Sequence, residues 1–335
     1  MVCDKEKLES LWVKGKKFLG CQYPIMGGAM SWISENNLVS TISNCGAFGV
    51  IACSAMSPTQ LHEQILLTQK KLVGKRFGVN LVVMHPELES LIDVCLSSGV
   101  THITLAGGIP SKLLIKKIKD GGANVIAFAP SLSVAKKMQK LGVDALIIEG
   151  SEAGGHVGKV STSVLAQEIL PQIKDVPVFV AGGIGTGEIL VNYLKMGAAG
   201  CQIGTLFACA KESIAHPNFK RKLIGAFSHD TTVSLQVDNE FPVIPVRSIK
   251  NAATKDFLGF QKSVIADCKA GKMTKKDGQL AIEKFWAGAL KKAVIDGEVE
   301  RGSLMAGEIV GMIKAELSVE QIIDNIVAQA VSYSA

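Results

Sequence analysis

The strongest constraint on the fold is a regular alternation of short apolar runs with longer amphipathic stretches, which fills the first two-thirds of the chain. Each apolar run ends in Gly, Pro or a small polar residue, and this arrangement is typical of βα units. The runs predicted to be strands are 22–26, 49–53, 77–83, 102–106, 124–129, 145–149, 178–181 and 201–204. Helices are predicted between them, over 57–72, 86–98, 111–120, 131–141 and 188–196.

Most of these strands are apolar along their whole length rather than alternately polar and apolar. A strand of that kind is covered by helices on one face and by a core on the other, so the pattern predicts a parallel sheet. An open, doubly wound sheet is the alternative, but eight consecutive βα units of even spacing favour closure. We therefore predict an α/β protein built on a TIM (β/α)8 barrel.

The pattern changes after about residue 210. Residues 230–246 are irregular, 251–292 are predicted to form helices separated by glycines, and 303–329 are helical again. We expect residues 1–212 and 305–335 to form the barrel. Residues 213–304, in the C-terminal third, are expected to form a smaller, mostly helical lid domain that covers the substrate.

Composition excludes several classes of protein. Of the 335 residues 47% are hydrophobic, which is enough to bury a large core. The eight cysteines are scattered without a CxxC pair, which favours free thiols in a reducing compartment. The sequence has neither an apolar stretch as long as a membrane span nor a signal segment. We expect a cytoplasmic protein that does not bind a membrane.

The net charge of +6 comes from lysines spread along predicted helices, such as Lys112, Lys116 and Lys136. We interpret them as solvated outer faces, because aromatic residues are not interleaved with them as they are on nucleic-acid surfaces. Nucleic acid is therefore not an expected partner, whereas an acidic protein is left open. The sequence also lacks the His, Cys and carboxylate spacing of a zinc or iron site, so no metal is expected.

In a barrel of this kind the active site lies at the carboxyl ends of the strands. The seventh predicted strand runs into AGGIGTGE (181–188) and the eighth into QIGTLF (202–207). Both segments bring glycines and backbone N–H groups to the place where such barrels hold a phosphate. Either loop alone is equally well explained as a tight turn, but the pair favours phosphate binding.

Two other strand ends suit a flat ring. The first strand runs into MGGAM (26–30), where small residues would let a ring lie against the backbone. The third contains Asn80, whose amide has the donor and the acceptor that match the edge of a flavin pyrimidine. A strand-end amide that caps backbone groups is an equally good interpretation of Asn80.

The sharpest local signal is EGSEAGGHVG (149–158), which follows the sixth predicted strand. Glu149 and His156 put ionisable groups where packing alone would favour none, and the histidine could polarise a carbonyl or pass a proton near neutral pH. A structural histidine bound to a loop carbonyl is the alternative. A hydrolase is disfavoured because no GxSxG elbow follows a strand, and a Schiff-base aldolase because no predicted strand contains a lysine.

Together these segments resemble the FMN-dependent, TIM-barrel enoyl-acyl-carrier-protein reductases of the FabK type, within the nitronate monooxygenase (2-nitropropane dioxygenase-like) superfamily. The resemblance covers nearly the whole chain. It rests on residues 23–32, 77–83, 129–159, 180–188, 202–207, 211–218, 247–251 and 302–311. The glycine–histidine segment is specific to the superfamily, whereas the last four segments point to the reductases.

The resemblance implies FMN as cofactor, NADH or NADPH as co-substrate, and His156 as the catalytic histidine. The residues implied for FMN binding are Gly27, Gly28, Ala29, Met30, Asn80, Glu149, Gly154, Gly155, Ala181, Gly182, Gly183, Gln202, Gly204 and Thr205. The leading hypothesis is enoyl-thioester reduction in fatty-acid synthesis, in which hydride passes from NAD(P)H through FMN to the β-carbon. His156 would then stabilise the enolate-like transition state or relay the proton to the α-carbon.

Nitronate oxidation and NAD(P)H:quinone reduction are kept as alternative activities, and a flavin- or phosphate-binding barrel without turnover as an alternative of another class. Three departures from the family pattern leave this last alternative open. Gly27 stands where relatives often have Gln, Ile109 replaces an amide residue in the fourth-strand loop, and Leu206 stands where arginine is common. An acyl carrier protein and a second copy of the chain are left open as partners.

Overall fold

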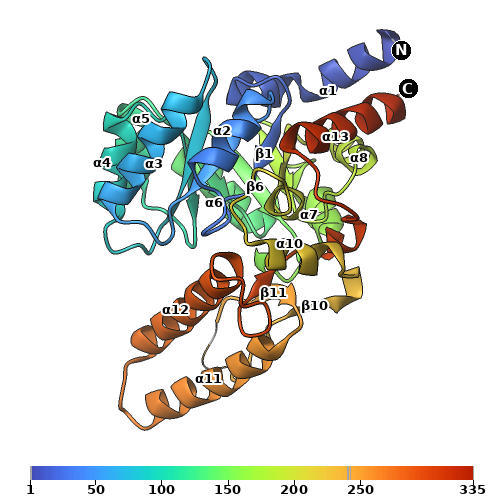
Figure 1. Cartoon of the computed structure of the whole chain (residues 1–335). Coiled ribbons are helices and arrows are strands. Elements are labelled where there is room, and N and C mark those ends of the chain that lie inside the picture. Colours follow the sequence, from blue (N-terminus) through green and yellow to red (C-terminus); the bar gives the residue numbers. More distant parts are fainter. Residues whose placement is uncertain (1, 240, 242, 335) are drawn as a thin grey trace.

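The computed structural model describes residues 2–239, 241 and 243–334 and confirms the predicted barrel (Figure 1). Its parallel strands are β1 (Ile25–Gly27), β2 (Gly49–Ala52), β3 (Phe77–Val82), β4 (His102–Ala106), β5 (Asn124–Phe128), β6 (Ala145–Glu149), β8 (Val178–Ala181) and β9 (Gly200–Ile203). Their order in the sheet is β1-β9-β8-β6-β5-β4-β3-β2, and a bridge between Met26 and Phe48 joins β1 to β2. The Gly27 N–H donates to the Phe48 carbonyl at 2.8 Å, so the sheet closes on itself.

Helices surround the barrel, and their ends follow from local sequence. The outer helices are α2 (Asn36–Asn44), α3 (Pro58–Lys71), α4 (Leu88–Ser97), α5 (Lys112–Asp120), α6 (Leu132–Leu141), α7 (Thr162–Ile169), α8 (Gly187–Met196) and α13 (Val319–Tyr333). Two short helices, α9 (Thr205–Ala208) and α10 (Pro217–Ile224), follow the last strand. The hydroxyls of Ser57 and Ser111 accept backbone N–H groups three residues further on and cap α3 and α5. Gly197 ends α8 in the left-handed conformation, with φ of 109°.

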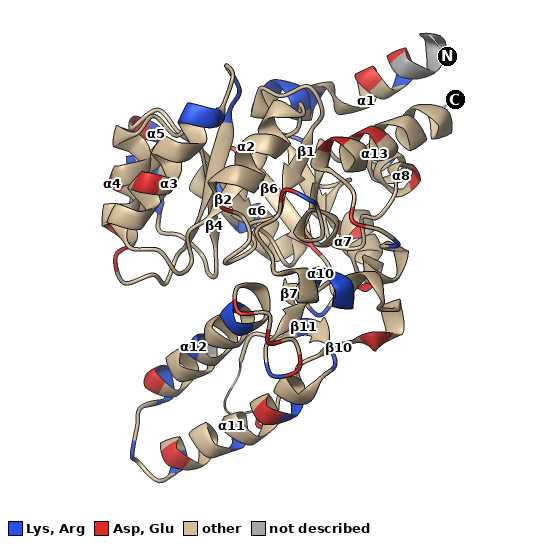
Figure 2. Ribbon diagram, in the orientation of Figure 1, with Lys and Arg blue, Asp and Glu red and all other residues tan. Residues whose placement is uncertain are grey.

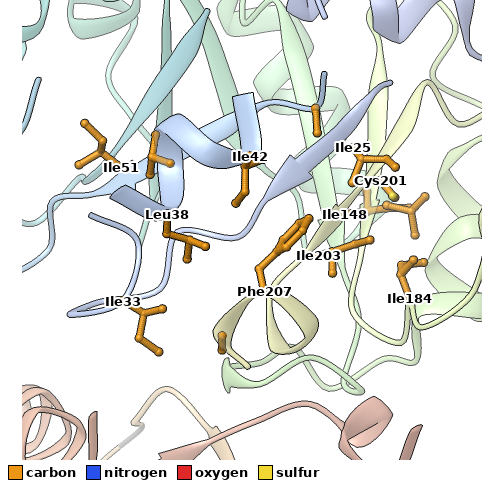
Figure 3. Close-up of a cluster of buried hydrophobic side chains, with 14 of the residues drawn as sticks. Ile25, Ile33, Leu38, Ile42, Ile51, Ile148, Ile184, Cys201, Ile203 and Phe207 are labelled. Carbon is orange, nitrogen blue, oxygen red and sulfur yellow. The ribbon is translucent and has the colours of Figure 1, made fainter. Parts of the chain in front are cut away.

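Each strand turns alternate side chains toward the helices and toward the barrel interior, because the side-chain period of a strand is two residues. Between the sheet and the helices near β1 and β9, the strand residues Ile25, Cys201 and Ile203 are in one core with the helix residues Leu38, Ile42 and Phe207 (Figure 3). The residues that fill the interior form a separate cluster, which includes Met26, Val50, Ile126, Ile147 and Phe179. The barrel is therefore packed on both faces of its sheet.

The amino-terminal end of the barrel is filled by helix α1 (Val2–Leu19), which the sequence patterns did not predict. Leu19 is fully buried in the interior cluster, and Phe18 packs against that cluster. The buried ring of His102, at the start of β4, meets the rings of Phe18 and Phe48 edge-on at 5.1 and 5.0 Å. Its Nε2 lies 3.0 Å from the Phe18 carbonyl oxygen, to which the neutral ring donates. Because this end is closed, a ligand can enter only from the carboxyl ends of the strands.

A second, smaller unit stands beyond the carboxyl ends of the barrel strands (Figure 1). Its antiparallel sheet is built from β10 (Thr231–Val233), β11 (Val246–Ile249), β12 (Leu304–Met305) and β7 (Gly155–His156). The short 3₁₀ helices η1 (Ser228–Asp230) and η2 (Glu308–Met312) flank this sheet in the sequence. Strand β7 comes from the loop after β6, so the barrel itself contributes one strand of the small sheet.

The rest of this unit is a hairpin of two long helices, α11 (Ala252–Lys269) and α12 (Lys275–Val294). Aromatic rings hold the two helices together. The rings of Phe257 and Trp286 lie 4.2 Å apart, and those of Phe260 and Phe285 are stacked at 5.0 Å. This aromatic core is separate from both barrel cores. The helical character expected for this region is present, whereas its small sheet was not expected; the boundaries at 213 and 304 stay predictions.

The first strand begins three residues later than predicted. The N–H groups of Gln22 and Tyr23 both donate to the Gly46 carbonyl, at 2.9 and 2.8 Å, and Pro24 has no N–H to give to a ladder. These contacts make the segment a turn, and β1 starts at Ile25. None of the helices in the described residues is long and apolar enough to cross a membrane.

His102 makes a testable contribution to the pH dependence of stability. Burial lowers the pKa of its imidazole from 6.5 to about 4, against the opposing effect of the Phe18 carbonyl. The unfolded chain therefore takes up this proton at a higher pH than the folded protein. We expect the free energy of unfolding to fall by about 3 kcal/mol from this group as pH drops from 6.5 to 4.

The measurement is chemical denaturation at several pH values for the wild type and His102→Asn. The variant is expected to be less stable at pH 7, because it loses the ring contacts, but to lose less further stability on acidification. Parallel losses in the two proteins between pH 6.5 and 4 would show that His102 is not the responsible group.

Candidate active site

Three polar side chains predicted from the sequence come together inside the carboxyl end of the barrel. Asn80 lies between Val79 and Leu81, whose side chains belong to the outer core, so the Asn80 amide faces the interior. The same alternation turns Glu149 inward, because Ile148 is in the outer core and Ile147 is in the interior cluster. Gln202 also faces inward, since both of its neighbours in β9 are in the outer core.

The strand register puts Glu149 and Gln202 at the same height along the barrel axis. Glu149 pairs with Ala181, Ala181 pairs with Gln202, and Gln202 pairs with Met26. These four residues form a continuous row across β6, β8, β9 and β1 at the mouth of the barrel. The row combines two polar side chains with two apolar ones, which suits a flat ring with polar edges.

One more residue, Thr104 of β4, was missed by the sequence analysis. It pairs with Asn80, is buried, and faces inward because Ile103 and Leu105 belong to the outer core. A threonine hydroxyl between two outward-facing apolar residues is a signal that the sequence HITLA contains. The alternation could therefore have identified Thr104 beside Asn80.

The inward polar groups are available to a ligand. In the part of the chain that the structure describes, the side chains of Asn80, Glu149 and Gln202 make no hydrogen bond. The polar atoms of these side chains are not among those sealed from solvent, so a ligand that enters the site can form hydrogen bonds with them. Burial raises the pKa of the Glu149 carboxyl from 4.5 to about 8. This carboxyl is therefore mainly protonated at neutral pH and can donate as well as accept a hydrogen bond.

The loops after β8 and β9 have the glycines that a phosphate cradle needs. Gly182 and Gly183 have φ angles of 84° and 73°, which other residues rarely adopt. A Cβ at Gly182 would lie 3.1 Å from the Ala153 backbone nitrogen. Within residues 2–239, 241 and 243–334, the N–H groups of Gly182, Gly183 and Gly204 make no hydrogen bond. Not every expected N–H is available, because the Gly187 N–H donates to the Gln329 side chain at 2.8 Å.

The loop after β1 packs directly against this cradle. The Gly28 N–H donates to the Ile203 carbonyl at 2.8 Å, and a Cβ at Gly28 would lie 3.2 Å from the Gly204 Cα. The loop turns back through the Ser34 hydroxyl, which donates to the Gly28 carbonyl at 2.7 Å. Trp32 has a φ of 66°, an unfavourable value for a large side chain. Its indole Nε1 donates to the Ala287 carbonyl of α12 at 3.2 Å, so the barrel loop and the helical hairpin are in contact.

His156 lies in a different setting from the free loop that the sequence suggested. It belongs to β7, its backbone pairs with Val246 of β11, and its side chain is exposed. The next residue, Val157, donates its N–H to the Pro245 carbonyl at 3.0 Å. The histidine is therefore held at the junction of the barrel and the small sheet. Its predicted orientation toward a flavin stays a prediction.

Arg247 fixes the loop that carries His156. This buried side chain donates from Nε to the Ser151 carbonyl at 2.9 Å and from Nη1 to the Thr231 hydroxyl at 2.9 Å. Its Nη2 forms an ion pair with Glu308 at 2.8 Å. One guanidinium thus joins the β6 loop, the small sheet and η2. From the sequence alone Arg247 is only part of the family segment 247–251, because its partners are distant in sequence.

An open hollow of about 630 Å³ lies beside the mouth of the barrel, after β3 and β4. Its lining is half apolar and half polar or charged: Val83, Pro86, Leu88, Ile109 and Leu114, with His85, Glu87, Glu89, Ser90 and Ser111. Ile109, one of the departures from the family pattern, is 45% exposed on this wall. In the described residues no group of three or more His, Cys, Asp or Glu side chains is arranged to hold a metal ion.

A closed barrel with inward polar side chains and glycine loops at its mouth can hold a flat, phosphorylated molecule. The profile of the nitronate monooxygenase family matches residues 14–91 and 88–329. The chain therefore belongs to the nitronate monooxygenase family, and it is an oxidoreductase whose structure supports the FabK type within that family.

Similar proteins differ in their named activities. A relative from Rhodococcus jostii (strain RHA1), 31% identical over 94% of each chain, is named (3aS,4S,5R,7aS)-5-hydroxy-7a-methyl-1-oxo-octahydro-1H-indene-4-carboxyl-CoA dehydrogenase. One from Staphylococcus saprophyticus, 27% identical over 93% of this chain and 96% of its own, is named a probable nitronate monooxygenase. Among solved structures, FabK from Thermotoga maritima has a TM-score of 0.84, with 30% identity over 95% of each chain.

Replacing Arg247 should loosen the histidine loop. In Arg247→Met the Glu308 carboxylate and the Ser151 carbonyl lose their shared partner, and we expect a loss of about 2 to 4 kcal/mol in the free energy of unfolding. Hydrogen exchange should rise in residues 150–158 more than in β8. Arg301→Met, at an exposed position, is the control. Unchanged exchange in residues 150–158 of Arg247→Met would contradict the role given to this side chain.

Proposed function

We propose that this chain is an FMN-dependent reductase of enoyl thioesters, which uses NADH or NADPH as the hydride source. The observation that carries the proposal is the division of the site between a barrel mouth suited to a flavin and a separate covering unit joined to it through the His156 strand. A covered mouth of this kind can receive a substrate that is carried on a long arm. The Staphylococcus relative spans the same unit, so the thioester is chosen on the likeness to FabK, which is 30% identical over 95% of each chain.

The residues at the barrel mouth fit FMN. Asn80, Thr104, Glu149 and Gln202 would bind the polar edge of the ring, since the side chains of Asn80, Glu149 and Gln202 are without partners in the described chain. The segment from Gly27 to Met30 would lie along the ring, with Ala181 at the end of β8 and with Gly154 and Gly155 where the β6 loop enters β7. Gly182, Gly183, Gly204 and Thr205 would bind the phosphate. When bound, the flavin supplies hydride relay between the nicotinamide and the substrate.

The chain's own residues would control the proton. His156 is proposed to stabilise negative charge on the thioester oxygen and to hold the proton that is delivered to the α-carbon. Arg247 positions this strand without touching the substrate. The apolar residues Val83, Ile109 and Leu114 would contact part of the acyl chain, on one side of a hollow whose other side is polar.

One relative supports thioester chemistry but not the direction of the reaction. The name of the Rhodococcus relative refers to a coenzyme A thioester and to a dehydrogenase, so oxidation of an acyl thioester is a second candidate. Nitronate oxidation is a third, because the family and the Staphylococcus relative bear that name.

Anaerobic half-reactions separate these candidates. Protein loaded with FMN should be bleached by NADH or NADPH, and crotonyl thioester should then restore the flavin absorbance. His156→Ala should keep FMN and its reduction, but slow the reoxidation by about 100-fold. His229→Ala, at an exposed position, is the control. Reoxidation by nitronate with no reduction by either nicotinamide would overturn the proposal, and an unchanged rate in His156→Ala would make this residue structural.

A further inference from the structure

The helical hairpin carries most of the positive charge of the chain. Residues 252–294 contain nine lysines and four acidic residues, so they account for five of the six net positive charges. The much larger remainder of the chain is nearly neutral. A charge concentrated in this way on one projecting element indicates a surface that meets an anionic partner.

The lysines of α12 lie on one face of that helix. Ile282 and Trp286 pack toward α11, and the opposite face presents Lys276, Lys284 and Lys291, spaced by eight and seven residues. Leu280, which is 53% exposed, lies between the first two lysines of this lysine face. Figure 2 shows basic residues along α12, including its end near the barrel.

The lysine face is not neutralised within the protein. Among the described residues no carboxylate forms an ion pair with Lys276 or Lys284. The acidic neighbour Asp277 instead accepts a hydrogen bond from the Thr274 hydroxyl at 2.6 Å. The outward positive charge of these lysines is therefore available to a partner.

One end of the lysine face lies at the candidate active site. The Lys291 ammonium lies 5.2 Å from the centre of the Trp32 ring, and the Trp32 indole donates to Ala287 of the same helix. Trp32 belongs to the loop that packs Gly28 against Gly204. A partner that lies along α12 would therefore have one end at the mouth of the barrel.

We propose that the lysine face of α12 docks an acidic helix of the protein that carries the thioester, and this inference rests on the proposed function. From Lys276 to Lys291 the face extends about 22 Å, which matches an acidic helix of about four turns. The phosphates of coenzyme A are close together at one end of that molecule and would reach only part of the face. The spacing of the three lysines therefore favours a carrier protein as the occupant.

The test compares two double charge reversals of equal size. Lys276→Glu with Lys284→Glu removes positive charge from the lysine face but leaves Lys291 and Trp32 intact. Lys136→Glu with Lys137→Glu makes the same change on exposed positions of α6 and is the control. The probes are a crotonyl-loaded bacterial acyl carrier protein, crotonyl coenzyme A and the crotonyl thioester of N-acetylcysteamine.

For the α12 variant we expect kcat/KM with the carrier-protein probe to fall by about 10-fold to 100-fold, mainly through KM, and its salt dependence to weaken. The N-acetylcysteamine thioester and flavin reduction should be unaffected. Binding of the loaded carrier protein, measured directly by calorimetry, should weaken in parallel.

Three results would overturn the inference: equal losses in the α6 variant, unchanged carrier-protein binding in the α12 variant, or a loss as large with coenzyme A as with the carrier protein. The calorimetric measurement keeps this inference separate from the proposed function. If the wild type turns over none of the three thioesters, the proposed function fails, whereas docking is still judged by the binding of the carrier protein.

Discussion

The structure depends on closure of a parallel sheet whose strands must turn alternate side chains inward. Most inward positions are apolar and pack with the end of α1 at the amino-terminal end of the barrel. At the carboxyl end the inward positions are Asn80, Thr104, Glu149 and Gln202, and none of these side chains makes a hydrogen bond within the described residues. Closure of the sheet therefore brings these polar side chains together. The closure that stabilises the barrel also forms the candidate active site at the carboxyl ends of its strands.

The covering unit is attached to this site rather than merely placed near it. Strand β7 leaves the barrel to pair with β11, and the Arg247 guanidinium binds a barrel loop, the small sheet and η2 together. A second attachment joins Trp32 to α12. These contacts give the histidine strand and the basic hairpin fixed places relative to the barrel mouth.

Much of the barrel could be predicted from the sequence, because its strands are continuous apolar runs and its loops contain diagnostic glycines. Asn80, Glu149 and Gln202 lie on the strands to which the patterns assigned them. Arg247 could not be assigned a role in that way, since it contacts Ser151 across 96 positions in the sequence and depends on the register of a four-stranded sheet. The lysine face of α12 was also missed, because lysines in an amphipathic helix look alike until the packed face is known. The setting of His156 also differs from the loop that the sequence predicted, because its partner strand β11 is far away in the sequence.

The central claim is that the unpaired polar layer and the glycine loops together form a site for a phosphorylated flavin. The most direct measurement is titration of the apoprotein with FMN and, separately, with riboflavin, with flavin fluorescence as the signal that reports binding. The account predicts saturable binding of one FMN per chain and an affinity for riboflavin that is weaker by at least about tenfold, because the phosphate contacts are lost. Equal affinity for both flavins would contradict the phosphate cradle, and no saturable binding of either would contradict the site itself.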